Sequence, residues 1–401
     1  MADRRFQLPG IHELSKEQEA VRAWPLEGRF LLTGGPGTGK SVMCLLRARR
    51  LHDQLSSTSK NAAKKSPEYV FLVFNHLLMM SSKQLFGVDL SARQWQSWFE
   101  GVFKEATGKP LPKLAPPPRS AWRPTDWESA CEMIRERSPN ELQEKFQHLS
   151  VIIDEGQDMP VEFYQCLNEL GIDNLFVAAD FNQSIGHENC SYTDLLDAIQ
   201  PDKEHRLASN YRNKYAIARL AQEFYTGDPS AKPPELPEPP IKMVRRPVFF
   251  RYVESKEERL LKRVMMFCDR YPRKLIGILT PNDASRSRLF NGLRDSGATF
   301  ENGKPLVSTF SSRERNEIDF GQGGVVIINA QACKGLEFDV VFLFDLNEYH
   351  YRHEFEVEKK SLFYVMVARA VDQVFLLAGM DKDCPIEAIL PIEENILERK
   401  P

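Results

Sequence analysis

The sequence predicts an α/β fold of two lobes, each a mostly parallel sheet flanked by helices, with a small helical insertion in the first lobe. Near the start, a short apolar strand at 29–33 leads through a glycine-rich segment into helix formers at 42–51. Another apolar strand, at 151–153, ends in two carboxylates. In the C-terminal half, strands alternate with helical stretches, which is typical of parallel sheets. The strands expected there are 246–253, 274–280, 325–329, 340–344 and 374–378, with helices at 255–270 and 283–294.

The composition is that of a soluble globular protein. Of 401 residues, 42% are hydrophobic and 27% are charged, and the length suits two domains of ordinary size. The first ten residues lack the apolar core of a signal peptide, and no apolar run nears the roughly 18 residues of a membrane helix. The seven cysteines form no C-x-x-C pair, so we expect neither a disulfide framework nor a zinc site. We expect the protein to reside in a reducing cytoplasm. A net charge of −3 argues against wholesale coating of nucleic acid, though not against a local basic groove.

The segment 34–41, GGPGTGKS, fits the phosphate-binding loop G-x-x-x-x-G-K-[ST] at every fixed position. Glycines let successive backbone N–H groups turn toward the phosphates, where a Cβ would collide. Lys40 is expected to reach the β- and γ-phosphates, and the Ser41 hydroxyl to ligate Mg²⁺. The loop residues expected to surround the phosphates are Gly35, Gly37, Thr38 and Gly39. A glycine-rich turn that matched by chance would not also have a strand before it and a helix after it, so we expect the chain to bind a nucleoside triphosphate.

Two strands of the N-terminal half end in polar side chains. After the strand 151–153 come Asp154, placed to hold Mg²⁺ opposite Ser41, and Glu155, the candidate base that orients and polarises water. An Asp-Glu pair is usually a solvated surface feature. Behind an apolar strand, in a chain with a phosphate loop, the functional interpretation is favoured. The stretch 175–182 is another strand ending in acid, and Gln183 follows it at a position that could sense the γ-phosphate.

Two further features each allow two interpretations. Ser15 is a plausible N-cap with Gln18 at the capping-box position, so Gln18 either completes that cap or reads the edge of adenine. Residues 92–148 carry many aromatic side chains around a proline-rich patch, which predicts a small helical insertion outside the sheet. Its tryptophans could stack on bases. A core belonging to the insertion itself is the favoured interpretation.

Taken in order, a series of stretches resembles the motifs of superfamily 1 helicases of the UvrD/Rep type. They are Gln18, GGPGTGKS at 34–41, DEGQD at 154–158, ADFNQSI at 179–185, NYR at 210–212, KGLEFD at 334–339 and FYVMVARA at 363–370. This resemblance covers both ends of the chain. It implies two RecA-like lobes that clamp ATP and Mg²⁺ between them, while single-stranded nucleic acid runs across their top. We expect the first lobe at 1–203, with its insertion at about 92–148, and the second at 204–401.

The resemblance also implies roles for individual residues. Gln18 would read adenine, and Tyr211 would stack on it. Arg212 and Arg369 would be the two arginines that the second lobe directs at the γ-phosphate, and Glu337 would contact the ribose. Taken singly, either arginine would more often be half of a surface salt bridge, but its position in a motif favours the catalytic role.

The sequence departs from this family at positions that normally stack on bases. Gln331 stands where a histidine is usual, Gly186 where an aromatic residue follows QSI, and Glu188 and Asn189 where a tryptophan is expected. Stacking of a base on an aromatic side chain contributes about 1–3 kcal/mol. These losses therefore argue against processive unwinding, and they leave the ATP chemistry intact.

Three functions remain open at this point. The first is an ATP-driven motor or remodeller acting on single-stranded nucleic acid, DNA in preference to RNA, with the 3′ to 5′ polarity that the resemblance implies. The second is an ATP-gated switch subunit that works with a partner protein, such as a nuclease in bacterial defence or repair. Short accessory segments, at about 92–148 and 297–323, favour it. The third is an unrelated phosphate-loop protein such as a small-molecule kinase, which would leave Tyr211, Arg212 and Arg369 unexplained.

Overall fold

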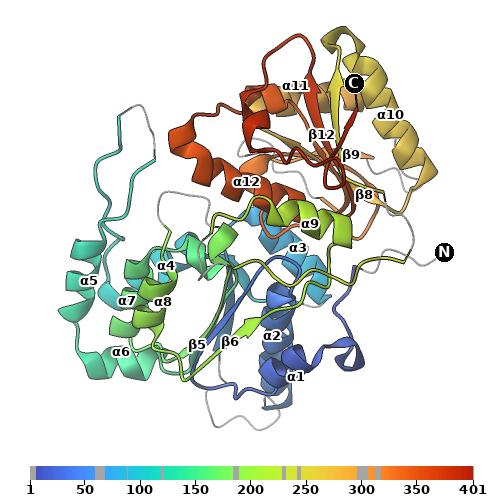
Figure 1. The fold of residues 1–401 in the computed structure, drawn as a ribbon. Helices are drawn as coiled ribbons and strands as arrows, with labels where there is room; N and C mark the ends of the chain where they lie inside the picture. Colours follow the sequence, from blue (N-terminus) through green and yellow to red (C-terminus); the bar gives the residue numbers. More distant parts are fainter. Residues whose placement is uncertain are drawn as a thin grey trace. The chain divides into compact units, whose positions relative to one another are not determined.

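A computed structural model of the chain describes residues 6–58, 68–87, 89–118, 122–183, 189–227, 232–241, 245–295, 306–311 and 318–400. Contacts divide the chain into two compact units, which we call lobes (Figure 1). The first lobe comprises Leu8–Thr33 and Lys40–Leu207. The second comprises the chain from Ala208 onward, grouped with Gly34–Gly39 and the residues before Leu8.

Some features expected from the sequence lie in parts of the chain that the structure does not describe. Gly186, Glu188 and most of the short accessory segment at 297–323 lie outside the described residues. The boundary expected between residues 203 and 204 stays a prediction, and the last strand of the first sheet runs past it to Leu207.

The sheet of the first lobe has six strands in the order β3-β2-β4-β5-β1-β6. Their bounds are β1 (Arg29–Gly34), β2 (Glu68–Val73), β3 (Ala92–Gln94), β4 (Leu149–Ile153), β5 (Asn174–Ala179) and β6 (Lys203–Leu207). The pairs β2–β3, β2–β4, β4–β5 and β5–β1 are parallel. Because β1, β4 and β5 are parallel neighbours, their carboxyl ends meet at one edge of the sheet, where ligands of α/β proteins bind.

Alternate residues of these strands enter two separate cores, one on each face of the sheet. In β4, for example, Val151 and Ile153 face one core and Ile152 the other. The second of these cores is closed by α1 (Lys16–Arg22), α2 (Lys40–Thr58) and α3 (His76–Phe86). The first is closed by α4 (Trp95–Thr107), α5 (Trp127–Arg135), α6 (Pro139–Phe146), α7 (Val161–Glu169) and α8 (Tyr192–Ile199). Burial on both faces explains why the central strands are continuous apolar runs.

The segment 92–148 is helical, as expected, but it is not separate from the sheet. Its first residues form the edge strand β3, which pairs with β2. The rings of Trp95 and Phe99 lie 5.2 and 5.4 Å from that of Phe163 on α7, and all three belong to the core that β4 shares. The prediction that the aromatic residues of 92–148 form a core of their own is therefore wrong. Helices of this length bury large rings only against a larger apolar surface, and the sheet face supplies it.

The sheet of the second lobe has seven strands in the order β13-β7-β12-β11-β8-β10-β9, and every neighbouring pair is parallel. Their bounds are β7 (Val248–Tyr252), β8 (Leu275–Thr280), β9 (Val307–Thr309), β10 (Gly324–Asn329), β11 (Phe338–Leu343), β12 (Ala370–Gly379) and β13 (Glu398–Lys400). The five predicted strands are present. The sequence missed β9 and β13 because each has three residues, too few to show a period.

The helices of the second lobe are α9 (Tyr215–Gln222), α10 (Glu257–Arg270), α11 (Asp283–Arg294) and α12 (Glu356–Ala368). The helices predicted at 255–270 and 283–294 correspond to α10 and α11. The predicted fold class is confirmed: both lobes are parallel α/β sheets flanked by helices, as in two RecA-like lobes, with helices α4–α6 inserted between β3 and β4 of the first. In the described part of the chain, none of the helices has the length and apolar character needed to cross a bilayer.

Gly277 on β8 is a position where the second sheet tolerates no side chain. A Cβ built there would lie 2.7 Å from the ring of Phe338 on β11, and both strands are buried. We expect Gly277→Ala to lower the free energy of unfolding of the second lobe by about 1–3 kcal/mol through overpacking. The measurement is urea unfolding followed by far-UV circular dichroism.

The matched control is Gly101→Ala in α4, where a Cβ meets nothing within 4 Å. Alanine is the better helix former, so this variant should gain about 0.5–1 kcal/mol. Equal stability of the Gly277→Ala variant and the parent would contradict the packing of β8 against β11.

Candidate nucleotide site

The phosphate-loop segment follows β1 and leads into α2, which is the predicted strand–loop–helix order. Gly37 and Gly39 have φ angles of 77° and 96°, a region that glycine adopts without strain. The Thr38 hydroxyl donates a hydrogen bond of 2.8 Å to the carbonyl oxygen of Gly35, which closes a tight turn within the loop. Because α2 begins at Lys40, the loop ends at the positive end of a helix dipole. Backbone N–H groups at such a place can bind an anion.

Lys40 lies beside a carboxylate that the sequence reasoning did not single out. Its side chain is buried, and Nζ is 3.6 Å from Oδ2 of Asp180, just after β5. The same oxygen accepts a hydrogen bond from Nε2 of Gln183, the predicted γ-phosphate sensor. The Asp180 N–H donates to Oε1 of Gln157 at 2.8 Å, which fixes this strand end to the turn that follows β4. The signal for Asp180 was present in the sequence, since the strand 175–182 was predicted to end in acid.

Asp154 and Glu155 follow β4 at the same sheet edge, and both are buried. Asp154 accepts hydrogen bonds from the Ser41 hydroxyl and, at 3.1 Å, from the Glu155 N–H. Glu155 has a left-handed φ of 58°, which is strained for a residue with a side chain and recurs at functional sites. Its Oε2 accepts a 2.8 Å hydrogen bond from Nε2 of Gln157, so the carboxylate is held in a fixed position.

The residues around Asp154 fit a divalent cation. Burial, together with the nearby Glu155 charge, raises the pKa of Asp154 to about 6, although Ser41 and Lys40 oppose the rise. Its Oδ2 is buried without a hydrogen-bond partner. Such an oxygen is costly unless a proton or a cation compensates for it. Mg²⁺ prefers hydroxyl and carboxylate oxygens, with nucleotide phosphates and water completing its shell. Ser41 and Asp154 are the side chains that would hold it.

We expect Asp154→Asn to stabilise the first lobe above neutral pH. The pKa of Asp154 is raised on folding, so its contribution to stability is present below about pH 4 and is lost as the pH rises through about 6. An asparagine keeps the accepting oxygen and removes the buried charge. The gain should be about 1–3 kcal/mol near pH 8 and should shrink toward about pH 5.

Tryptophan fluorescence during urea unfolding measures this gain selectively, because all five tryptophans lie in the first lobe. Equal stability of Asp154→Asn and the parent at both pH values would contradict the buried charge.

Gln18 completes the N-terminal cap of α1. The Ser15 N–H donates to Oε1 of Gln18 at 3.1 Å, and the Gln18 N–H donates to Oγ of Ser15 at 3.3 Å. The capping interpretation is therefore confirmed. The adenine-reading role stays a prediction, since a capped amide is also a rigidly placed one.

The predicted residues of the second lobe lie on the segments before α9, before β11 and after α12. Tyr211 is exposed, with 58% of its surface accessible. Arg212 Nε donates to Oε2 of Glu337 at 2.7 Å, so the predicted finger and the predicted ribose contact form one ion pair. Arg369 is buried at 1% exposure, and its guanidinium donates to the carbonyl oxygens of Val365 at 3.0 Å and Leu336 at 3.4 Å.

Two asparagines join these arginine-bearing segments: Asn210, which the sequence analysis named only as part of the NYR motif, and Asn213, which it did not name. Nδ2 of Asn213 donates to the carbonyl oxygens of Ala368 and Ala370, at 3.0 and 2.6 Å, on either side of Arg369. Its Oδ1 accepts from Nδ2 of Asn210 at 2.9 Å, and Oδ1 of Asn210 accepts from the Arg212 N–H at 3.0 Å. Asn213 is 4% exposed. One side-chain network therefore fixes the backbone beside both arginines, and no spacing in the sequence indicates it.

Replacing Asn213 with the similarly sized Leu should leave two buried carbonyl oxygens without their donor. We expect the free energy of unfolding of the second lobe to fall by about 1–3 kcal/mol. Far-UV circular dichroism during urea unfolding gives the value. Asn291→Leu, at an exposed position of α11, is the matched control and should change stability by less than about 0.5 kcal/mol. Equal effects of the two variants would contradict the role of the Asn213 network.

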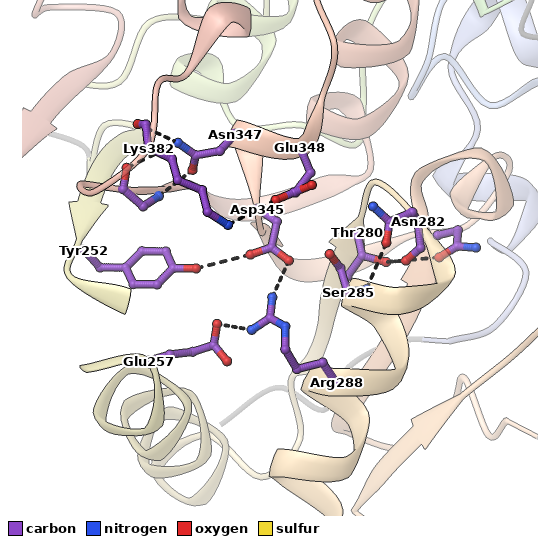
Figure 2. Close-up of polar contacts among 12 residues, drawn as sticks. Tyr252, Glu257, Thr280, Asn282, Ser285, Arg288, Asp345, Asn347, Glu348 and Lys382 are labelled. Atoms are coloured by element: carbon purple, nitrogen blue, oxygen red, sulfur yellow. Dashed lines mark hydrogen bonds and ion pairs between the residues drawn. The ribbon is translucent and has the colours of Figure 1, made fainter. Parts of the chain in front are cut away.

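A separate polar cavity of about 490 Å³ lies at the carboxyl ends of strands of the second sheet (Figure 2). At its centre, Asp345 accepts a 3.2 Å hydrogen bond from the Tyr252 hydroxyl and pairs with Arg288 at 2.5 Å; Arg288 also pairs with Glu257. Asp345 has a φ of 55° and begins a short 3-10 turn after β11, as Glu155 does after β4. Its carboxylate is bound on two sides, so this turn joins β7, α11 and β11 structurally.

Comparison with known proteins identifies one part of the chain by sequence. Residues 306–379 match the family model of the UvrD-like helicase C-terminal domain. This match confirms the resemblance for residues 306–379 of the second lobe, and Glu337 and Arg369 lie within it. The search of curated proteins found no match.

Two of the solved structures that are similar to this chain are the following. The C-terminal domain of a possible DNA helicase from Lactobacillus plantarum WCFS1 has 18% identity and a TM-score of 0.33, covering 48% of this chain and 99% of that one. S. cerevisiae Dbp5 bound to RNA and ADP BeF3 has 13% identity and a TM-score of 0.49, covering 98% of this chain and 90% of that one.

Proposed function

We propose that this chain, whose residues 306–379 match the UvrD-like helicase C-terminal domain, hydrolyses ATP and couples the hydrolysis to binding, translocation on or remodelling of single-stranded nucleic acid. The observation that carries the proposal is the convergence of Lys40, Ser41, Asp154 and Glu155 at one edge of the first sheet, with an orphaned carboxylate oxygen among them. A phosphate loop alone supports nucleotide binding. The two buried carboxylates beside it support hydrolysis.

In this proposal the phosphate loop and the residues at the edge of the first sheet bind the nucleotide and prepare the water. The loop N–H groups and Lys40 bind the phosphates, and Ser41 and Asp154 hold Mg²⁺, which when bound neutralises charge on the phosphates. The Glu155 carboxylate, fixed by Gln157, orients the attacking water and accepts its proton. Gln183 senses the γ-phosphate.

The second lobe supplies positive charge and nucleoside contacts. Arg212 and Arg369 would stabilise the charge that develops on the γ-phosphate, a contribution worth about 10³–10⁵ in rate where an arginine finger is measured. Tyr211, which is exposed, would stack on adenine that Gln18 reads, and Glu337 would contact the ribose. Because Arg212 pairs with Glu337, nucleotide binding and arginine placement would change together.

The nucleic-acid partner is single-stranded, DNA in preference to RNA, with movement from 3′ to 5′. This part of the proposal rests on the family resemblance. Gln331, exposed in the structure, replaces a residue type that stacks on bases, and so does Asn189. The proposal therefore favours short-range translocation or remodelling over processive unwinding.

The test is ATP turnover of the full chain with single-stranded DNA, single-stranded RNA, duplex DNA and no polymer. Single strands should raise turnover severalfold, DNA most. Glu155→Gln should keep ATP binding and lower kcat by about 10²–10⁴, because geometry survives and the base is lost. Glu144→Gln, an exposed acid on α6, is the control and should match the parent.

Two results would contradict the proposal. Equal ATP turnover with every polymer and without any polymer would contradict the motor function. Hydrolysis of ATP by Glu155→Gln at the rate of the parent would contradict the assignment of Glu155 as the base.

A second candidate is an ATP-gated switch subunit that works with a partner protein such as a nuclease. The burial of Trp95 and Phe99 in the core of the first lobe favours it, because these aromatic residues of the insertion are then unavailable to bases. Purification of the native protein separates the two candidates. A stable complex whose ATPase responds to the partner and not to single strands supports the switch, and a monomer stimulated by single strands supports the motor.

A further inference from the structure

Two cysteines of the first lobe lie in direct contact across neighbouring helices. Sγ of Cys131 on α5 is 2.9 Å from Sγ of Cys166 on α7, and both residues are buried. A disulfide bond has an S–S length of about 2.05 Å, so the sulfurs would have to approach by less than about 1 Å. The two helices run side by side in the first lobe (Figure 1).

A second contact holds the helices in the register that brings the sulfurs together. Arg135 lies one turn after Cys131 on α5, and Glu169 lies one turn after Cys166 on α7. Arg135 Nε and Oε1 of Glu169 are 2.8 Å apart. Both thiols belong to the hydrophobic core of this face of the sheet, together with their neighbours Ala130 and Leu167. The thiols therefore lie in a packed interface between α5 and α7, with an exposed ion pair one turn further along.

We propose that Cys131 and Cys166 are a site of reversible thiol–disulfide modification that fixes α5 to α7. With hydrogen peroxide as the oxidant, the Cys131 thiolate attacks one peroxide oxygen and the O–O bond breaks. The leaving hydroxide takes the proton that the thiol released, giving a sulfenic acid and one water. The Cys166 sulfur then displaces the sulfenic hydroxyl, forming the S–S bond and a second water. Two thiols and one hydrogen peroxide thus give one disulfide and two waters.

The chemistry of the two thiols assigns the order of these steps. The hydrogen bond between them lowers the pKa of Cys131 and raises the pKa of Cys166, and the Arg135 charge also lowers the pKa of Cys131. Cys131 is 7% exposed and Cys166 is fully buried. Thiolate character and access together determine which thiol reacts first, so Cys131 reacts with the peroxide and Cys166 then resolves the sulfenic acid.

The remaining cysteines differ from this pair. Burial raises the pKa of each of their thiols, and no sulfur–sulfur contact joins them within the residues that the structure describes; they are Cys44, Cys190, Cys268, Cys333 and Cys384. Oxidation should therefore be selective. The disulfide would close a loop that contains β4 with Asp154 and Glu155, and the proposal does not depend on the ATPase.

The experiment treats the full, reduced chain with hydrogen peroxide, blocks free thiols, and maps the peptides by mass spectrometry. One product should lack two hydrogen atoms and contain Cys131 linked to Cys166, and dithiothreitol should reverse it. The oxidised parent should also melt several degrees higher by tryptophan fluorescence, since the crosslink restrains the unfolded chain. Cys190→Ser, a buried cysteine of the same lobe, should form the link as the parent does.

Cys131→Ser should form no linked product and gain no thermal stability on oxidation. If the parent instead gives sulfinic acid at these residues without a linked peptide, or links other cysteines equally fast, the proposal is wrong. Mapping of the parent decides this even if a variant fails to fold.

Discussion

The buried carboxylate of Asp154 is the constraint on which the rest of the candidate site depends. It lies at the end of β4 beside the Ser41 hydroxyl, with Oδ1 bound by the Glu155 N–H and Oδ2 without a hydrogen-bond partner. A fold that keeps such a group away from water must compensate for its charge. Lys40 and a cation bound with the phosphates are the available compensation. If the proposed site binds Mg²⁺ and ATP, nucleotide binding and the stability of the first lobe are coupled through this side chain.

The same local backbone geometry occurs in both lobes, but the carboxylates that it carries have different surroundings. A parallel strand ends, a residue takes a left-handed φ, and a 3-10 turn follows, at Glu155 after β4 and at Asp345 after β11. Asp345 is engaged by Tyr252 and Arg288, so its charge is satisfied within the lobe. Glu155 accepts a hydrogen bond from the Gln157 amide and lies beside the Asp154 carboxylate. Glu155 is the base that we propose for ATP hydrolysis.

Sequence reasoning succeeded where local chemistry determines the structure. The buried strands are continuous apolar runs, and the phosphate loop needs glycines at fixed spacing, so both were predictable. It failed for the aromatic residues of 92–148, because whether Trp95 packs on its own segment or on the sheet depends on tertiary contacts. The Asn210–Asn213 network was equally hidden, since its partners lie more than a hundred residues away along the chain. The strands β9 and β13 have three residues each, so no hydrophobic alternation marks them in the sequence and only pairing with a neighbouring strand defines them.

The most direct test of the central claim is equilibrium binding of ATP to the full chain by calorimetry, with Mg²⁺ and with a chelator, for the parent and for Asp154→Asn. If Asp154 and Ser41 hold the cation, the parent should bind ATP more tightly with Mg²⁺ than without it, and Asp154→Asn should lose most of that difference while still binding ATP through Lys40 and the loop. An identical Mg²⁺ dependence in the two proteins would contradict the assignment of the metal to this carboxylate.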